Sequence, residues 1–343
     1  MKRILVLGAF GYRETLYDGQ TIKTRNLFDL IKAEYKSVQY YDTQELQYSK
    51  LGYLKMLWEI VMTKYLVYLP AHNNLTYFFP LIFVLSKLFN IKIHYFVVGG
   101  WLKELIEDKP IHQWMLRQIE GIHCETRLMK HNLEKCYKFE NVDTFPNFRK
   151  TKFVPQSHHT PGFLRVVFMA RINKMKGLDL VFKLGDSINN LKLGQKISID
   201  FYGPLQNEDN DEKYFNENIA KYSFMSYLGP VEPENIYTTL EKYDVMILPT
   251  HYYTEGLPGS VLDAYIAGIP VVVTNWKHAP EFVDDNSTGL IIPFKDDGSA
   301  LFKSILHLLQ NEELLQRMKH NARNKSFDYS AEQALIQIKK YIT

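Results

Sequence analysis

The sequence predicts an α/β protein of two tandem units, each with a parallel sheet covered by helices. A single hydrophobic core stops growing at about 250–300 residues, and this chain has 343. Short apolar runs alternate with longer stretches of helical periodicity, which is the order typical of βαβ units. The alternation is interrupted over residues 145–162, a Pro-, His- and Thr-rich stretch with little periodicity, where we expect the two units to join.

The first half of the chain supplies one series of elements. The apolar runs that we expect to be strands are residues 2–10, 37–43, 65–70 and 92–100. The stretches with helical spacing are residues 19–36, 56–64 and 75–89. The start reads as a first buried strand and not as a signal peptide. The stretch 75–89 is the most membrane-like, but a spanning helix needs roughly 18–20 apolar residues, so we expect a buried helix.

The second half supplies another series of the same kind. The expected strands are residues 164–171, 196–203, 242–250 and 270–274. The expected helices are residues 177–188 and 260–267, and residues 330–342 form a terminal amphipathic helix. There is no periodic repeat and no low-complexity tract.

Charge and cysteine content exclude several functions. The net charge of +3 is too small to indicate nucleic-acid binding. Residues 1–150 carry 21 Lys and Arg against 15 Asp and Glu, whereas residues 151–343 carry 20 against 23. A mildly basic first half suits a surface that meets anionic lipid or an anionic ligand, and ordinary scatter explains it equally well. The two cysteines lack the spacing of a zinc site or a disulfide framework, so a reducing cytoplasm is expected.

Ligands of parallel α/β sheets bind at the carboxyl ends of the strands, so the loops after the strands are the candidate sites. After the first strand, Asp18-Gly19-Gln20-Thr21 precedes a helix whose free N–H groups could hold an anion. The alternative is a loop glycine with an N-capping side chain. After the fourth strand, Gly99-Gly100-Trp101 could offer an indole to a sugar ring or simply cover the edge of a core.

The second half has two such loops. Arg171 and Lys176 flank a turn into a helix that starts near Gly177, and two cations there could hold a diphosphate. The alternative is a solvated basic loop, since Lys174 lies there too.

The other loop is TEGLPGSVLDAYIAGIP, in which Glu255 and Asp263 are eight residues apart. The turn between them, made by Gly256, Leu257, Pro258 and Gly259, would expose helix N–H groups to phosphate or sugar oxygens. Glu255 could face a ligand, and Asp263 could accept hydrogen bonds from a vicinal diol such as a ribose. The alternative is a loop charge and an exposed helix residue.

Motifs of other enzyme classes are missing from the sequence. It contains no GKS/T phosphate loop, no HExxH, no GxSxG and no DxD pair in a strand-end loop. These absences argue against a P-loop ATPase, a zinc hydrolase and an α/β-hydrolase.

Four segments in order resemble the retaining glycosyltransferases of family 4, which have the GT-B fold. They are ARINKMKG, LGPVEPENIYTTLEKYDVMILPT, EGLPGSVLDAYIAGIPVVVT and APEFVDDNSTGLIIP. The likeness covers most of residues 163–343 and is looser before them, where it rests on the first Gly loop and on PNF at 146–148. It implies two Rossmann-like domains facing a cleft: an acceptor-side domain over 1–155 and a nucleotide-sugar domain over 156–328. Residues 329–343 would pack back on the first domain.

The resemblance also implies roles for individual residues. Arg171 and Lys176 would hold the diphosphate of a nucleotide-sugar donor, and Glu255 would contact the hydroxyls of the donor sugar. Asp263 would hold the ribose diol. The remaining implied donor contacts are the backbone of Gly256, Leu257, Pro258 and Gly259, the base-lining residues Gly203, Pro204, Leu228 and Gly229, and Gly19 and Gln20 from the other domain. No metal or other cofactor would be required.

The sequence departs from the family pattern at three places. The second acid is Asp263 where the family has glutamate, so we expect a re-angled ribose contact without loss of function. The strand-end position that often holds histidine is Val98 or Gly99 here, and His94 lies four or five residues too early. The turn carries Leu257 and Pro258 where an aromatic residue and a glycine are usual.

The expected function is transfer of a sugar from a nucleotide-diphosphate sugar to an acceptor hydroxyl with retention of configuration. The setting would be synthesis of a bacterial surface polysaccharide, in the cytoplasm or at the inner face of the membrane with peripheral contact to it. A sugar or a lipid-linked glycan would be the acceptor. Two alternatives stay open: a nucleotide-sugar epimerase, and a non-catalytic nucleotide-sugar-binding subunit.

Overall fold

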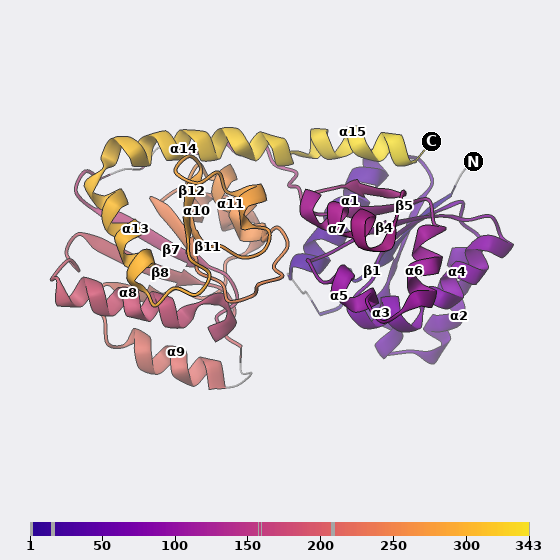
Figure 1. Cartoon of the computed structure of the whole chain (residues 1–343), viewed down its shortest axis with the longest axis horizontal. Helices are drawn as coiled ribbons and strands as arrows, with labels where there is room; N and C mark the ends of the chain where they lie inside the picture. Colours follow the sequence, from indigo (N-terminus) through magenta and orange to yellow (C-terminus); the bar gives the residue numbers. More distant parts are fainter. Residues whose placement is uncertain (1–2, 15–17, 157, 159, 207–209, 343) are drawn as a thin grey trace. The chain divides into compact units, whose positions relative to one another are not determined.

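The computed structural model describes residues 3–14, 18–156, 158, 160–206 and 210–342. The chain divides into two compact units, which Figure 1 colours along the sequence. Unit 1 comprises residues 1–151 and 329–343, and unit 2 comprises residues 152–328. Each unit has one six-stranded sheet in which every pairing is parallel. The predicted α/β class with two parallel-sheet units is therefore confirmed.

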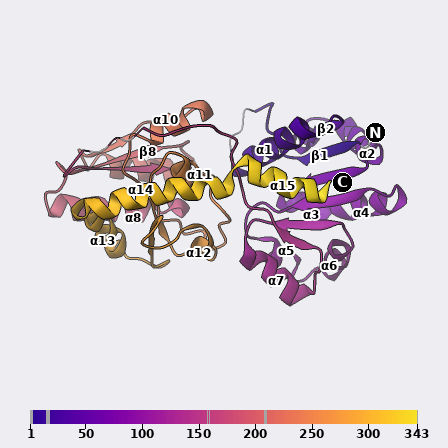
Figure 2. The ribbon, with the colours of Figure 1, turned by 90° about the horizontal axis from the view of Figure 1, so that it is seen from above.

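The sheet of unit 1 has the strand order β2-β1-β3-β4-β5-β6. Its strands are β1 (Ile4–Gly8), β2 (Val38–Asp42), β3 (Tyr65–Leu69), β4 (Lys92–Phe96), β5 (Gly121–Cys124) and β6 (Val142–Thr144). Its helices are α1 (Gly19–Glu34), α2 (Lys50–Val61), α3 (His72–Tyr77), α4 (Phe79–Leu88), α5 (Leu102–Ile106), α6 (Pro110–Arg117), α7 (Arg127–Tyr137) and α15 (Ala331–Tyr341). The helix α15 packs beside α1, as the view from above shows (Figure 2).

The sheet of unit 2 has the strand order β12-β11-β10-β7-β8-β9. Its strands are β7 (Leu164–Met169), β8 (Ile197–Tyr202), β9 (Met225–Tyr227), β10 (Val245–Leu248), β11 (Val271–Thr274) and β12 (Gly289–Ile292). Its helices are α8 (Leu178–Asn190), α9 (Asp211–Ile219), α10 (Ile236–Leu240), α11 (Gly259–Ile266), α12 (Ala279–Phe282), α13 (Ser299–Gln310) and α14 (Glu312–Ser326).

Hydrophobic burial explains why the central strands are the most apolar stretches of the chain. A parallel strand covered by helices on both faces has no solvated side, so it reads as a continuous apolar run. All residues of β1, β3, β10 and β11 are buried. Of these strands, β1 and β3 flank the point at which the strand order of unit 1 reverses, and β10 borders the corresponding point in unit 2.

One predicted helix is divided in the structure. Residues 75–89 were expected to form one helix. In the structure α3 ends at Tyr77, and α4 starts at Phe79 with Pro80 in its first turn. Proline lacks the N–H that would continue a preceding helix but suits a helix start, which explains the break. Within the described part of the chain, no helix has both the length and the apolar content that crossing a bilayer requires.

Candidate active site

The loops after β7 and β10 lie where the strand order of unit 2 reverses. From β7 the chain runs outward through β8 and β9, and from β10 it runs outward to the other side through β11 and β12. The connections on the two sides therefore diverge from the carboxyl ends of β7 and β10, which is where ligands of such sheets bind. Arg171, Lys176 and Glu255 follow these two strands.

An ion pair joins the two loops. The Lys176 Nζ lies 2.6 Å from the Glu255 Oε2, although the residues are 79 positions apart in the sequence. The side chains are 9% and 19% exposed, so both charges have lost most of their water. The ammonium also lies 5.1 Å from the centroid of the Tyr252 ring. The structure thus brings a predicted cation and a predicted acid into direct contact.

The backbone conformation of the loop after β7 brings Lys176 close to the loop after β10. The Asn173 Oδ1 accepts a hydrogen bond from the Lys176 N–H at 3.0 Å, which closes a short turn over Lys174–Lys176. Gly177 follows with φ +89°, and a Cβ there would lie 1.9 Å from the Pro249 carbonyl oxygen. Only glycine allows both the left-handed backbone and the close contact with the β10 loop.

A second polar link between these elements was missed by the sequence analysis. The His251 Nε2 lies 2.7 Å from the Asp179 Oδ1. The hydrogen bond to Asp179 raises the pKa of His251, although partial burial opposes it. Partial burial alone would raise the pKa of Asp179, but the hydrogen bond and charge of His251, the Leu180 N–H and the charge of Lys183 together lower that pKa. The signal in the sequence was a histidine three residues beyond the end of β10, at a ligand-binding edge.

The other cations of the β7 loop differ in their surroundings. Arg171 is exposed, and within the described residues its side chain makes no hydrogen bond or ion pair. Lys174 pairs with Asp211 at 3.8 Å and lies 5.0 Å from the Tyr214 ring centroid. Lys174 is thus engaged by α9, whereas Arg171 is available to an anionic ligand.

The turn after Glu255 leads directly into α11. Gly256, Leu257 and Pro258 are buried, and Gly259 is the first helical residue. No side chain among the described residues caps this helix start. The Val261 N–H donates to the Pro258 carbonyl at 3.1 Å, which leaves the N–H groups of Gly259 and Ser260 for a ligand oxygen. Asp263 lies four residues into α11 and is 7% exposed. The interpretation of Asp263 as an exposed helix residue is therefore wrong.

The predicted base-lining residues lie at the same edge of the sheet. The Gly203 N–H donates to the Gly229 carbonyl at 3.1 Å, and the Ile172 N–H donates to the Pro204 carbonyl at 2.9 Å. Gly203 has φ +135°, and a Cβ there would lie 1.9 Å from the carbonyl oxygen of Ala170. Leu228 is 51% exposed. The loops after β7, β8 and β9 are thus hydrogen-bonded into one continuous edge.

In unit 1, the loop residues Gly19 and Gln20 also lie at a reversal of strand order, between β1 and β3. The Gln20 Nε2 donates to the Leu69 carbonyl at 3.4 Å, at the end of β3. The Asp18 Oδ1 accepts from the N–H groups of Gln20 and Thr21, each at 2.9 Å. An anion at this helix start would have to compete with the Asp18 carboxylate, although a Cβ on Gly19 would meet nothing within 4 Å.

The segment after β4 rests on a buried ion pair that the sequence analysis also missed. The Lys23 Nζ lies 2.6 Å from the Glu125 Oε1 and donates to the Val97 carbonyl at 2.7 Å. These side chains are 0% and 3% exposed. Beyond Val97, Gly99 has φ +76°, Gly100 is buried, and Trp101 packs against the core with its ring 5.1 Å from that of His72. Trp101 therefore covers a core edge while remaining partly accessible.

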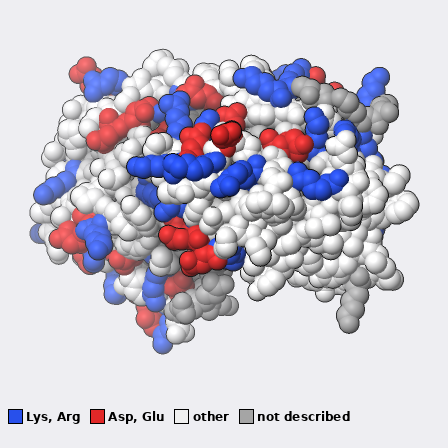
Figure 3. All heavy atoms as spheres, turned by 45° about the vertical axis from the view of Figure 1, so that its right-hand side comes forward, with Lys and Arg blue, Asp and Glu red and all other residues white. Residues whose placement is uncertain are grey.

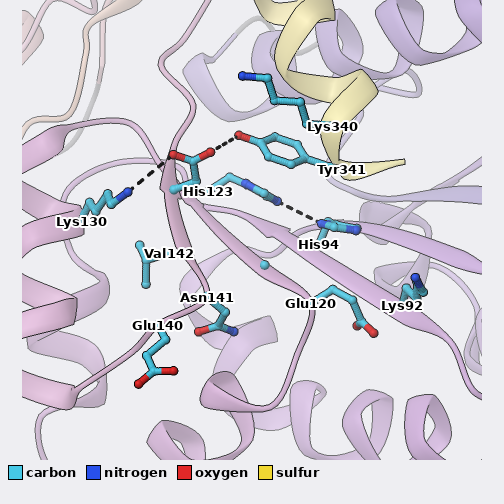
Figure 4. A pocket seen from close by; sticks show the side chains of 12 residues that line it. Lys92, His94, Glu120, His123, Lys130, Glu140, Asn141, Val142, Lys340 and Tyr341 are labelled. Atoms are coloured by element: carbon cyan, nitrogen blue, oxygen red, sulfur yellow. Dashed lines mark hydrogen bonds and ion pairs between the residues drawn. The ribbon is translucent and has the colours of Figure 1, made fainter. Parts of the chain in front are cut away.

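His94 lies at the opposite edge of the sheet, in a pocket of about 550 Å³ (Figure 4). The first residues of β4, β5 and β6 line this pocket, so it belongs to the amino-terminal ends of the strands. The His94 Nδ1 is 3.1 Å from the His123 Nε2, and the ring of Tyr341 in α15 lies 4.0 Å from that of His123, tilted by 33°. Burial lowers the pKa of His94 to about 4, so this histidine is a neutral core residue and does not replace the family's strand-end histidine.

Residues 150–325 match the family model described as glycosyl transferases group 1. The chain belongs to this family. The resemblance seen in the second half of the sequence is therefore confirmed at the level of the family. The matched segment contains every residue of the unit 2 site.

Curated relatives are distant and partial. The chain is 27% identical over 158 residues to "Putative colanic acid biosynthesis glycosyltransferase WcaL" of Salmonella typhimurium, covering 44% of this chain and 37% of that protein. It is 26% identical over 164 residues to "Capsular polysaccharide biosynthesis glycosyltransferase CapM" of Staphylococcus aureus, covering 46% and 40%. The chain spans 44%, 64% and 37% of the length of three such relatives.

Solved structures share the whole architecture. A sucrose-phosphate synthase from Thermosynechococcus elongatus superposes with a TM-score of 0.79 at 13% identity, over 99% of this chain and 98% of that one. HepE of Anabaena, solved in complex with UDP-glucose, gives 0.76 at 13% identity, over 99% of each chain. The GT-B fold expected from the resemblance is confirmed by these neighbours.

Proposed function

We propose that the protein transfers a sugar from a nucleotide-diphosphate sugar to an acceptor hydroxyl, with retention of the anomeric configuration. The observation that carries this proposal is the Lys176–Glu255 pair at the reversal of strand order, beside the uncapped start of α11. A cation, an acid and free N–H groups within one edge suit a substrate that combines phosphates with sugar hydroxyls.

Each charged group has a task in this reaction. Arg171, Lys176 and the N–H groups of α11 stabilise the negative charge that develops on the departing diphosphate. Glu255 accepts hydrogen bonds from donor-sugar hydroxyls, and Asp263 accepts them from the ribose diol. The bond between the anomeric carbon and the diphosphate oxygen breaks with its electron pair going to the diphosphate. The acceptor oxygen attacks from the same face, and its proton passes to the leaving phosphate. With these cations as the electrostatic partners, the reaction we propose uses no metal ion.

The relatives support a role in making a surface polysaccharide. Two of them are named for colanic acid biosynthesis and capsular polysaccharide biosynthesis. A neighbour of the same fold was solved with UDP-glucose. We therefore propose a nucleotide-diphosphate sugar as the donor and a sugar or glycan hydroxyl as the acceptor.

The proposal is tested by a thermal-shift panel of UDP-, GDP-, ADP- and TDP-sugars, followed by NMR of the product formed from the donor that binds. A ligand at 100 times its Kd stabilises a protein by about 2.7 kcal/mol, which is easily detected. We expect stabilisation by one nucleotide class and a product with the anomeric configuration of the donor. No stabilisation by any nucleotide sugar would contradict the proposal, and an inverted product would contradict retention.

A further inference from the structure

The first turn of α8 carries a carboxylate beside the turn that holds Lys176. Asp179 follows Lys176 by three residues and is the acidic residue of that first helical turn. A diphosphate bound at Lys176 would bring its negative charge to this start of the helix. Because like charges repel in a partly water-excluded place, an unneutralised Asp179 would weaken the binding of such a ligand.

The overall charge of unit 2 does not offset this carboxylate. Residues 152–328 carry 18 Lys and Arg against 22 Asp and Glu, so the unit as a whole does not attract an anion. Figure 3 shows basic and acidic side chains interspersed over the visible face of unit 2. At physiological ionic strength, exposed charges more than about 8 Å apart are largely screened from one another. The charges within the site therefore decide how an anion binds there.

His251 supplies the positive charge that neutralises Asp179. Its Nε2 lies 2.7 Å from the Asp179 Oδ1, and the two side chains are 31% and 38% exposed, so the contact is partly shielded from water. The hydrogen bond to Asp179 raises the pKa of His251 above 6.5, although burial and the charge of Lys183 oppose it. At pH 6.5 more than half of the His251 side chains are therefore positively charged.

The backbone around His251 is hydrogen-bonded to the turn that carries Lys176. The His251 N–H donates to the Met175 carbonyl at 2.8 Å, and the Thr250 Oγ1 donates to the same carbonyl at 3.2 Å. His251 thus contacts Met175 through its backbone and Asp179 through its ring, on the two sides of Lys176 in the sequence. A change at this ring can reach Lys176 through position and through charge, without a contact between His251 and the ligand.

The other charged or titratable groups around this pair differ from His251 in kind. They are Lys183 on α8, Tyr214 on α9, which interacts electrostatically with Asp179, Tyr252 and Glu255 in the loop after β10, and Lys174 and Lys176 in the turn after β7. Histidine is the side chain whose ordinary pKa lies within the neutral range. Among these groups, His251 is therefore the one whose charge changes near neutral pH.

We propose that His251 is a positioning residue of the donor site: its imidazolium neutralises Asp179, so that the diphosphate of a nucleotide sugar binds beside Lys176 most tightly when His251 is protonated. This inference rests on the proposed function, because it takes a nucleotide-diphosphate sugar as the ligand. Donor affinity falls as pH rises through the folded pKa of His251. Because the bound anion stabilises the imidazolium, donor binding also takes up protons around and above that pH.

Calorimetric titration of the full chain tests the inference, with the nucleotide sugar selected by the thermal-shift panel. A nucleotide sugar is used because the terminal phosphate of a free nucleoside diphosphate itself titrates near pH ~6. Between about pH 6 and about pH 8.5 we expect the Kd of the natural chain to rise about three- to tenfold. His251→Gln should bind with the weaker Kd at every pH. The control His307→Gln, at an exposed position of α13, should behave like the natural chain.

A second substitution distinguishes neutralisation of charge from a purely structural role. Asp179→Asn removes the carboxylate, so adding it to His251→Gln should restore tight binding at every pH. If the pair only held the loops together, the double variant would bind no better than His251→Gln. Tight binding that returns in the double variant also shows that its fold is intact.

Proton uptake gives an independent measurement. Titrations in two buffers with different ionisation enthalpies should show proton uptake on donor binding in the natural chain and none in His251→Gln. A Kd that does not change with pH in the natural chain, or a double variant that stays weak, would overturn the inference while leaving the proposed function intact. Failure of every nucleotide sugar to bind the natural chain would overturn both.

Discussion

At the scale of single residues, Lys176 and Glu255 form an ion pair in a partly buried place. Such a pair adds little net stability, but removing one partner leaves the other charged and poorly solvated. A ligand that brings its own anion next to Lys176, and hydroxyl donors next to Glu255, can replace both halves of the pair. The ion pair therefore holds the two side chains in position until such a ligand replaces it.

The first prediction separates Lys176 from its neighbour Lys174. Because Lys176 faces the β10 loop and Lys174 is engaged by Asp211, only the first should act on the leaving diphosphate. Lys176→Ala should lower kcat/KM by at least about 100-fold. Lys174→Ala, the matched control from the same turn, should stay near the natural rate. Equal losses in both variants, measured on folded protein, would show that general loop charge and not this contact matters.

The second prediction concerns the His251–Asp179 pair and pH. The folded-state pKa of His251 is raised above 6.5, so its contribution to stability is present below 6.5 and is lost as pH rises through the folded value. The folded-state pKa of Asp179 is lowered below 3.8, so its contribution is present above 3.8 and is lost as pH falls through the folded value. The pair should thus stabilise unit 2 most between pH 3.8 and 6.5.

Urea unfolding of His251→Gln across that range checks the prediction. The free-energy difference from the natural chain should be largest in mildly acidic buffer and should shrink above the folded pKa of His251. The variant His307→Gln, at an exposed position of α13, is the control and should show no such trend. If the difference in unfolding free energy between His251→Gln and the natural chain did not change with pH, the raised pKa of His251 would be contradicted.

Some of these residues could be predicted from the sequence and others could not. Arg171, Lys176, Glu255 and Asp263 were candidates because they follow apolar runs that could only be buried strands. The sequence does not show which candidates touch, since the contact between positions 79 apart depends on the order of strands in the sheet. His251 was missed because its partner is in the first turn of a different element.

At the scale of elements, the turn from β7 into α8 depends on the missing side chain of Gly177. A residue with a Cβ would pay for the left-handed backbone, at about 1–2 kcal/mol, and would also collide with the Pro249 carbonyl. The third prediction compares Gly177→Ala with Gly162→Ala, since Gly162 has φ +74° but nothing within 4 Å of its Cβ position.

Both variants should lower the free energy of unfolding, and Gly177→Ala should lower it by at least about 2 kcal/mol more than the control. The same variant should also weaken donor binding, because the collision displaces the loop that carries Lys176. Equal destabilisation in urea unfolding would mean that the close approach of the two loops is absent in solution.

The apolar run around a strand decided whether the sequence could predict it. The strands β3 and β10 fall inside long apolar runs and were predicted, and the terminal helix was predicted to within one residue at each end. The strands β5 and β9 read GIHC and MSY and lack the continuous apolar run that marks β10, which is itself only four residues long. They form because neighbouring strands supply hydrogen bonds, which is information that a local pattern does not contain.

At the scale of the whole molecule, both ends of the chain build unit 1. Ile338 and Ile342 from the end of the chain share one hydrophobic cluster with Ile4 and Val6 from its start. The division of the chain places residues 329–343 with unit 1, although α14 immediately before them belongs to unit 2. The stability of unit 1 therefore depends on a helix that is separated from the rest of it by all of unit 2.

The fourth prediction tests this dependence with two isoleucines of α15. Ile338 is fully buried, whereas Ile336 is 54% exposed. Ile338→Ala should destabilise the protein by about 2–5 kcal/mol, through lost burial and the cavity left behind. Ile336→Ala, the matched control, should change the free energy of unfolding by no more than about 0.5 kcal/mol. Similar effects from both would show that α15 is not packed on this core.

We propose that the carboxyl edge of the unit 2 sheet, at the reversal of strand order between β7 and β10, holds the diphosphate of the nucleotide donor. A crystal structure with the nucleoside diphosphate selected by the thermal-shift panel tests it most directly. In that structure we expect phosphate oxygens at the first N–H groups of α11 and within hydrogen-bond distance of Lys176 and Arg171. The ribose hydroxyls should contact Asp263. A diphosphate bound elsewhere, with the Lys176–Glu255 pair undisturbed, would contradict it.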